Sequence, residues 1–534
     1  MFMIKLFKEE KFRYKIITLA VCAIMGWFLY NVASKVILSV NYPGEILEPA
    51  NVALSNLFKE GKSPYTLSAL GWDVPGINYD YPFLTSLVVA GISVITGLPT
   101  YVCHALLSFT CIVLSGALGY CVIRRYSGTT VAPTLGAFLF MICHWRFGFV
   151  SASPDDFGEF LFLLTLLFAV WPKITNKPLW CAIGVTLCFY AKQYFVFSAF
   201  GIFIYFLLYS RKTALKFFLY TLVINVAVGI AITLFWPLYW TYSVLFLYAG
   251  CFTGEGFGLG YFLGQMKYLA AIFVGLFAIL IVALVRIVRR MKKSGSKLLQ
   301  LKPKENDALS LFIIQIPAMF LPLVFFGRND GAFLSYFLQL WMPSIVVVSL
   351  IAIERMKPEN REWIFTGLYV AIAVFTVYFG LGKLPMHKLT TDEREAWKRA
   401  YAIVDEYREK GDVYYARSLA YKAFELGNDD CVCGHDGEVT AETLQKWEKS
   451  SLLQTLFPYA DDIIKKNEEY RYDVQVKAAL AGHSLVTFET DGYSMLFSAQ
   501  ILEGWGYEFV DEIVLQLGNM PYTVDFYKST GLRQ

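Results

Sequence analysis

Apolar runs of about 20 residues recur along the sequence from residue 16 to residue 381. Each run is long enough to cross a bilayer as a helix. Lipid permits few other spanning structures, because unpaired backbone N–H and C=O groups are costly there. Charged residues make up only 17% of the 534 residues, whereas 56% are hydrophobic. Soluble domains rarely combine such values, so we predict an α-helical polytopic membrane protein.

The hydropathy pattern predicts about eleven transmembrane helices. The expected spans are 16–40, 101–123, 130–150, 158–171, 178–190, 193–210, 214–236, 265–288, 308–326, 333–353 and 362–381. One further apolar stretch, 83–98, is short and follows Pro82, so we expect it to lie at the outer face or to re-enter the membrane. If it crossed, Arg124 and Arg125 would lie outside, against the preference of basic residues for cytoplasmic loops.

The distribution of charge predicts the orientation of the chain. Lysines and arginines are concentrated at 1–15 and in the loops 124–125 and 286–304, which we therefore place in the cytoplasm. The carboxylates of the external loops are Glu45, Glu48, Asp73, Asp80, Asp155, Asp156, Glu255 and Asp330. We predict a multi-pass protein of the plasma membrane, with a cytoplasmic N-terminus and a cluster of acids at the external boundary.

The character of the sequence changes near residue 383. Residues 1–382 form the predicted transmembrane domain, and residues 383–534 are polar and contain no further span. Helical patterns cover 392–410, 440–456 and 494–504, and runs typical of strands cover 413–416, 484–488 and 512–517. We predict a small extracytoplasmic α/β domain. Within it, Cys431, Cys433 and His435 are a weak metal signal, for which an ordinary loop is the favoured interpretation.

The first external loop, 41–82, places carboxylates beside the membrane, where they are costly unless they lie at the water boundary or meet a cation. Apolar residues at helical spacing predict a helix from Glu45 to Glu60, which Gly61 can end. Glu45 and Glu48 then share one face of its first turn. They either take part in chemistry or simply favour the helix dipole while solvated.

Three other external segments carry candidate site residues. Asp155 and Asp156 open a predicted span, where they either cap it or bind a metal or polar ligand near Glu48. Lys192 either extends its ammonium to the headgroups or neutralises a lipid phosphate. Arg328 either anchors the helix end at the membrane boundary or pairs with a phosphate through its planar guanidinium. We expect Tyr336, in the same segment, to face the interior of the bundle.

A carboxylate base, a second carboxylate and one or two cations at the phosphate level are what sugar transfer from a lipid phosphate needs. Aromatic side chains for stacking on sugar rings are plentiful nearby. The formal charge of +4 is too small to suggest nucleic acid as a partner. A lipid-linked sugar flippase or solute transporter remains a competing class, and a non-catalytic scaffold for envelope assembly is another.

The motifs occur in an order that resembles the GT-C superfamily of integral-membrane glycosyltransferases. After the first span come an acid at a helix start, G-x-x-x-Y at Gly61 to Tyr65, and Tyr81-Pro82. SPDD, AKQ and GRNDGAFLSYFLQL follow in the later external segments. The resemblance covers residues 16–350. It implies a GT-C fold and a polyprenyl-phosphate sugar donor. It also implies a cell-envelope glycan or lipid acceptor outside the membrane.

The resemblance also implies roles for individual residues in an inverting hexosyl- or pentosyltransferase. Glu48 matches the catalytic acid of the first loop, and Glu45 is its competitor. Lys192 and Arg328 match positions that hold the donor phosphate. The expected supporting and acceptor-binding residues are Asp155, Asp156, Asp80, Tyr81 and Tyr336. Asp155 could also hold a divalent cation, which would be Mg²⁺, Mn²⁺ or Ca²⁺.

Overall fold

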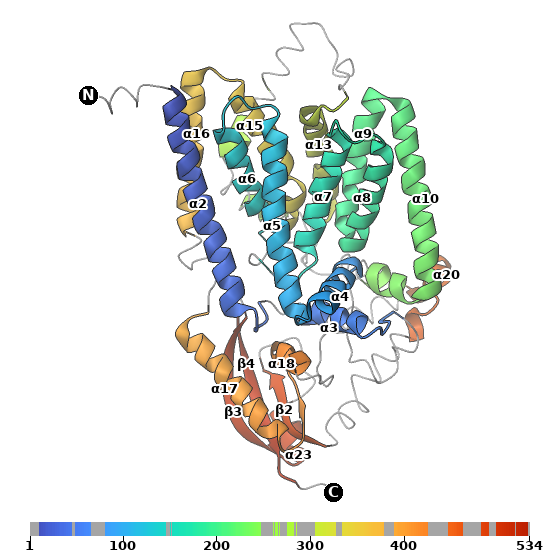
Figure 1. Ribbon diagram of the computed structural model, residues 1–534. Coiled ribbons are helices and arrows are strands. Elements are labelled where there is room, and N and C mark those ends of the chain that lie inside the picture. The colour runs from blue at the N-terminus through green and yellow to red at the C-terminus, as the bar shows by residue number, and fades with distance from the viewer. Residues whose placement is uncertain are drawn as a thin grey trace, which may run out of the picture.

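The computed structural model describes residues 10–44, 48–65, 81–145, 150, 152–246, 260, 262–264, 266–267, 275–281, 285, 305–326, 334–378, 389–425, 447–462, 482–490, 498–517 and 520–531. These residues form a bundle of long, roughly parallel helices with a sheet-containing domain at one end (Figure 1). The prediction of a helical membrane protein with a C-terminal α/β domain is therefore confirmed.

The bundle is built from helices that coincide with the expected spans. They are α2 (Glu10–Ser39), α5 (Thr100–Arg124), α6 (Val131–Cys143), α7 (Asp155–Val170), α8 (Lys177–Ala191), α9 (Ser198–Tyr209), α10 (Arg211–Phe235), α13 (Ala308–Phe326), α14 (Leu334–Leu340), α15 (Met342–Glu354) and α16 (Pro358–Tyr378). Within the described residues, three helices are long and apolar enough to cross a membrane: Lys11–Ile37, Thr100–Arg124 and Arg211–Phe235. The remaining apolar helices are shorter.

One expected span is interrupted. The continuous helix predicted over 333–353 is divided into α14 and α15 at Trp341. Pro343 lies in the first turn of α15, where its missing N–H costs nothing, and such a proline favours a new helix start over a continuous helix. The expected span 265–288 lies largely outside the described residues.

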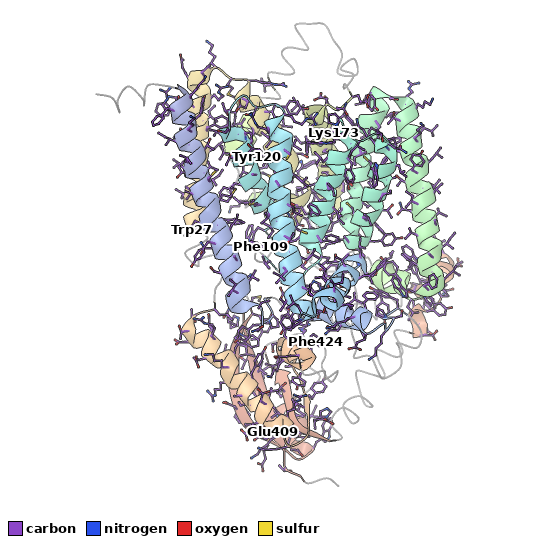
Figure 2. The ribbon with its side chains drawn as sticks, viewed as in Figure 1. Trp27, Phe109, Tyr120, Lys173, Glu409 and Phe424 are labelled. Carbon is purple, nitrogen blue, oxygen red and sulfur yellow. The ribbon has the colours of Figure 1, made fainter. Side chains whose placement is uncertain are left out.

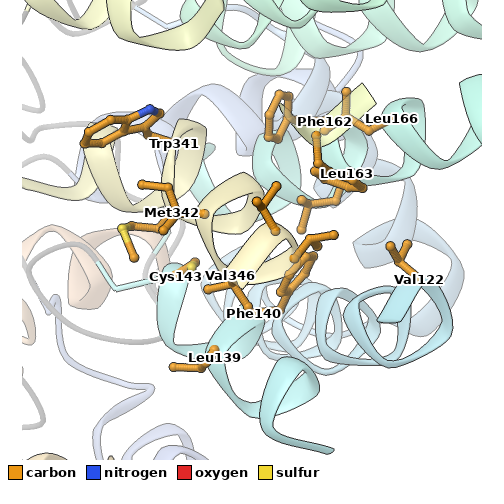
Figure 3. Packing of buried hydrophobic residues seen from close by; sticks show 14 of the residues in the cluster. Val122, Leu139, Phe140, Cys143, Phe162, Leu163, Leu166, Trp341, Met342 and Val346 are labelled. Atoms are coloured by element: carbon orange, nitrogen blue, oxygen red, sulfur yellow. The ribbon is translucent and has the colours of Figure 1, made fainter. Parts of the chain in front are cut away.

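The core of the bundle lies where α5, α6, α7 and α15 meet. Phe140, Phe162, Leu166 and Val346 are among its buried side chains (Figure 3). Helix association in lipid depends on close van der Waals packing, which small residues permit. A Cβ atom at Gly119 would lie 2.6 Å from the ring of Phe140, so this glycine lets α5 and α6 approach.

Two short helices cover the end of the bundle that faces the C-terminal domain: α3 (Glu48–Lys59) and α4 (Leu84–Thr96) (Figure 1). Helix α4 covers most of the stretch 83–98, which we expected to lie at the outer face or to re-enter the membrane. Gly61 ends α3 as predicted, with a left-handed φ of 73° and a hydrogen bond from Lys62 N to Leu57 O. Residues 45–47, the expected start of this helix, lie outside the described residues.

The C-terminal domain contains a four-stranded sheet and several helices. Its helices are α17 (Thr391–Arg408), α18 (Ala420–Glu425), α20 (Ser451–Leu456) and α23 (Ala499–Gly504), and its strands are β1 (Asp412–Tyr414), β2 (His483–Glu489), β3 (Tyr507–Leu517) and β4 (Met520–Ser529). The strand order is β1-β2-β4-β3, with β1 parallel to β2 and the other pairs antiparallel. Three of these strands lie on predicted runs, whereas β4 was not predicted.

Ion pairs lie at the end of the bundle that is away from the C-terminal domain. At the end away from the C-terminal domain, Arg13 pairs with Glu362 and Lys177 pairs with Glu305. Lys173 lies at the same end, and Phe424 lies where the C-terminal domain meets the bundle (Figure 2). Arg13, which the sequence assigns to the cytoplasm, therefore lies at the opposite end of the bundle from the C-terminal domain.

Candidate functional site

Glu48, the first residue of α3, has a buried carboxylate held by three separate segments of the chain. Its Oε2 accepts a hydrogen bond from the backbone N–H of Gly44 at 2.6 Å and another from the hydroxyl of Tyr421 at 3.0 Å. Its Oε1 accepts one from the backbone N–H of Ala152 at 3.1 Å. All three donors stabilise an ionised carboxylate, so Glu48 is fixed in both position and orientation.

A pocket opens beside this carboxylate, between the bundle and the C-terminal domain. It is lined by Lys35, Tyr42, Glu48, Tyr101, Tyr421 and Gln516, among others. The rings of Tyr101 and Tyr421 are stacked in its wall, with centroids 5.0 Å apart. The pocket therefore combines a carboxylate, an ammonium group and aromatic faces, a set of groups suited to a hydroxylated ligand.

Asp155, the first residue of α7, forms a buried ion pair with Lys192. The distance from Lys192 Nζ to Asp155 Oδ2 is 2.6 Å, and the two side chains are only 2% and 3% exposed. The hydroxyl of Tyr194 donates to Asp155 Oδ1 at 2.8 Å, and Ser153 contacts the carboxylate as well. Lys192 has an extended backbone between the end of α8 at Ala191 and a 3-10 helix at Gln193–Phe197.

Three tyrosine rings surround the ammonium of Lys192. Its Nζ lies 4.8 Å from the ring centroid of Tyr81, 5.0 Å from that of Tyr194 and 5.5 Å from that of Tyr336. Such contacts stabilise a cation that has lost its water. Tyr81 and Tyr336, which the sequence placed in the site, therefore lie around the predicted phosphate-binding lysine.

Asp156 points to different partners from those of Asp155. His144 Nδ1 lies 2.9 Å from Asp156 Oδ1, and the hydroxyl of Ser108 donates to Asp156 Oδ2. Glu159, one turn along α7, is fully buried with an oxygen 3.4 Å from the same imidazole nitrogen. This cluster joins α5, α6 and α7 and fixes the start of α7.

The segment from Ala152 to Asp156 connects these groups. Its first residue donates to Glu48, and its last two bind Lys192 and His144. The segment that carries Asp155 therefore contacts Glu48 through the backbone N–H of Ala152. The other predicted candidates lie outside the described residues. These are Glu45, Asp80, Arg328 and the group Cys431, Cys433 and His435.

Several residues of the site were not anticipated from the sequence. Tyr421 lies in a predicted soluble domain and carries no motif. Tyr194 directly follows the AKQ motif, but the sequence assigned it no role. His144 could have been selected from the sequence, because it lies in an apolar stretch. A titratable residue in such a stretch usually has a polar or charged partner.

The divalent cation expected at Asp155 finds few ligands around it. Mg²⁺ and Ca²⁺ require six or more oxygen ligands, several of them carboxylates or waters. Among the described residues, no group of three or more His, Cys, Asp and Glu side chains could hold a metal ion. The carboxylate of Asp155 is instead paired with an ammonium, and Asp156 faces an imidazole.

Neither a model of a known protein family nor a curated protein matches the sequence. The structure superposes on ArnT from Cupriavidus metallidurans bound to undecaprenyl phosphate with a TM-score of 0.54 and 12% identity. The match covers 94% of this chain and 98% of that chain. The apo state of this ArnT gives a TM-score of 0.54 and 14% identity over the same shares.

A weaker likeness, with a TM-score of 0.45 and 12% identity, relates the chain to the Archaeoglobus fulgidus oligosaccharyltransferase tethered with an acceptor peptide. It covers 94% of this chain and 74% of that chain and is too distant to inform the site. The likeness to ArnT, in contrast, includes both the bundle and the C-terminal domain. The chain has the same overall fold as this ArnT, which is the fold expected from the resemblance to the GT-C superfamily.

Proposed function

We propose that the protein is an inverting glycosyltransferase that acts on the outer side of the plasma membrane. It would move a hexose or pentose from a polyprenyl phosphate to a glycan or lipid of the cell envelope. The observation that carries this proposal is the carboxylate of Glu48, fixed by three donors at a pocket and connected through one short segment to Lys192. The fold shared with ArnT, which was crystallised with undecaprenyl phosphate, supports the donor class.

In the proposed reaction, Glu48 is the general base. Its carboxylate takes the proton of an acceptor hydroxyl while the hydroxyl oxygen attacks the anomeric carbon of the sugar. The bond between that carbon and the phosphate oxygen breaks, and the electron pair leaves with the polyprenyl phosphate. Attack opposite the leaving group inverts the configuration at the anomeric carbon. Glu45 is retained as the alternative base.

Lys192 is proposed to bind the departing phosphate. An ammonium has three N–H donors, so it can contact phosphate oxygens while it keeps its bond to Asp155. Asp155 would orient the ammonium, and the rings of Tyr81 and Tyr336 would exclude water from it. Removal of water strengthens the attraction between the ammonium and the developing charge. Arg328 is proposed as a second phosphate ligand, and Asp80 and Asp156 as supporting residues.

The proposal is tested with the purified full chain, a radiolabelled polyprenyl-phosphate sugar and a mixture of envelope acceptors. The Glu48→Gln variant cannot take a proton. Its amide keeps one acceptor oxygen, so one of the two backbone N–H donors retains its partner and the other meets the NH2 group. We expect transfer to fall by about 10²- to 10⁴-fold, which is the usual contribution of a general base. Elution from a sizing column should remain that of the wild type, and the apparent melting temperature should fall only slightly, because one buried donor has lost its acceptor.

The alternatives give different results in the same experiment. Covalent transfer by the wild type that survives in Glu48→Gln but is lost in Glu45→Gln would move the role of base to Glu45. Movement of labelled sugar across liposomes without transfer would indicate a flippase. Neither transfer nor movement would indicate a scaffold.

A further inference from the structure

We propose that Tyr421, in the C-terminal domain, is a positioning residue for Glu48 and makes the activity of the base depend on docking of that domain. The inference rests on the proposed function, because it assigns Tyr421 a role through the general base. Nothing in the motifs of the sequence points to this residue. It is identified only by the contact that the fold creates.

The contact between Tyr421 and Glu48 is buried and well formed. Both side chains belong to residues that are 4% exposed, and the hydroxyl oxygen lies 3.0 Å from Glu48 Oε2. Tyr421 packs in a small apolar cluster with Val52 of α3 and Ala152, so its position is tied to the two segments that hold the base. Stacking on Tyr101 fixes the plane of its ring.

The donors to Glu48 differ in origin. The N–H groups of Gly44 and Ala152 belong to the transmembrane domain, whereas the hydroxyl of Tyr421 comes from the C-terminal domain. A hydrogen bond to the ionised carboxylate favours the charged form that a base requires. Undocking of the C-terminal domain would remove this donor, so the base would be completed only when the domain is in place.

The same interface offers a control residue. The hydroxyl of Tyr401, on α17, donates to the backbone carbonyl of Asn41 at 3.0 Å. Replacing Tyr401 by Phe removes one hydrogen bond between the two domains, as Tyr421→Phe does, but leaves the donors to Glu48 in place. A difference between the two variants therefore reports on Glu48 and not on docking in general.

The experiment compares the wild type, Tyr421→Phe and Tyr401→Phe as purified full chains, with kcat/KM for transfer measured as a function of pH. The acidic limb of the profile reports ionisation of the base. Loss of the hydroxyl makes the ionised carboxylate less stable, so we expect the acidic limb of Tyr421→Phe to move to higher pH by about one unit. On that limb its rate should be about tenfold lower than that of the wild type. The limb of Tyr401→Phe should coincide with that of the wild type.

Two results would overturn the inference while leaving the proposed function intact. One is a Tyr421→Phe profile that superposes on that of the wild type. The other is a higher rate at every pH with an unmoved limb, which would show that the hydroxyl obstructs the base. Full activity of Glu48→Gln, or absence of transfer by the wild type, would instead refute the proposed function and this inference with it. The ring and its stack remain in Tyr421→Phe, so the variant is expected to fold, which its elution and melting temperature check.

Discussion

The buried pair of Lys192 and Asp155 permits a prediction that separates structural from chemical roles. At the observed 2.6 Å, the attraction between the two charges is about 6 kcal/mol for an effective dielectric constant of about 20. Each ion has also lost several kcal/mol of hydration, so the intact pair contributes little net stability. Loss of one partner leaves the hydration cost of the other uncompensated, which amounts to about 3–5 kcal/mol.

Three variants follow from these magnitudes. Lys192→Met leaves a buried carboxylate and should lower stability by the full 3–5 kcal/mol, roughly. Asp155→Asn leaves an ammonium that three tyrosine rings still contact, each worth about 0.5–2 kcal/mol, so it should be less destabilising. The double variant Lys192→Met with Asp155→Asn has no buried charge at the pair and should recover most of the stability of the wild type.

The assay is the apparent melting temperature of each purified variant, followed by intrinsic fluorescence under one set of detergent conditions, together with transfer activity. The double variant should melt close to the wild type but remain inactive, because the donor phosphate has lost its ammonium ligand. Lys398→Met is the control, since Lys398 pairs with Glu395 on the exposed surface of α17 and its loss should change stability little.

Either of two results would refute the roles given to Lys192 and Asp155. If Lys192→Met melted at the temperature of the double variant, the remaining carboxylate would still be hydrated. The pair would then not be buried in solution. If the double variant kept the transfer activity of the wild type, Lys192 would have no part in binding the phosphate.

Two further predictions concern the surroundings of the site. A Cβ atom at Gly44 would lie 3.2 Å from Glu48 Oε1, so Gly44→Ala should displace the carboxylate and lower transfer by between about 10- and 100-fold with little change in melting temperature. Gly91→Ala, where no atom lies within 4 Å of the added carbon, is the control, and equal rates for the two variants would contradict the argument. Because Asp155 is neutralised by Lys192, we expect transfer to survive prolonged treatment with EDTA. Loss of activity that added Mg²⁺ restores would show that the reaction uses a metal.

The helices of the bundle could be predicted because lipid restricts the chain to few structures, so apolar length alone indicates a helix. The division at Trp341 could not, since hydropathy is uniform across it and the break depends on local packing around Pro343. Strand β4 was missed for another reason. Its sequence contains Pro521, Asp525 and Lys528, which are uncommon in strands. The strand is stabilised by its pairing with β2 and β3, which its composition does not reveal.

The charged members of the site could be selected from the sequence because a carboxylate or ammonium beside lipid requires an explanation. Their partners could not. Gly44 and Ala152 bind Glu48 through backbone N–H groups, which no side-chain pattern reveals. Tyr421 is 373 residues from Glu48 in the chain, and only the fold brings the two together. The sequence likewise placed Lys192 near a phosphate without indicating that Asp155 would be its resting partner.

The way in which Glu48 is held has a consequence for the proposed chemistry. Each of the three hydrogen bonds to this carboxylate favours its charged form, and the same bonds make it a weaker base. A weak base suffices if the bond to the phosphate is largely broken before the hydroxyl proton moves, as in the oxocarbenium-like transition states of glycoside chemistry. Much of the barrier would then be lowered at the phosphate, where Lys192 lies in a setting with little water. Lys192 would then contribute more to lowering the barrier than Glu48 does. Loss of Lys192 should slow the reaction at every pH, whereas loss of a donor to Glu48 should mainly move its acidic limb.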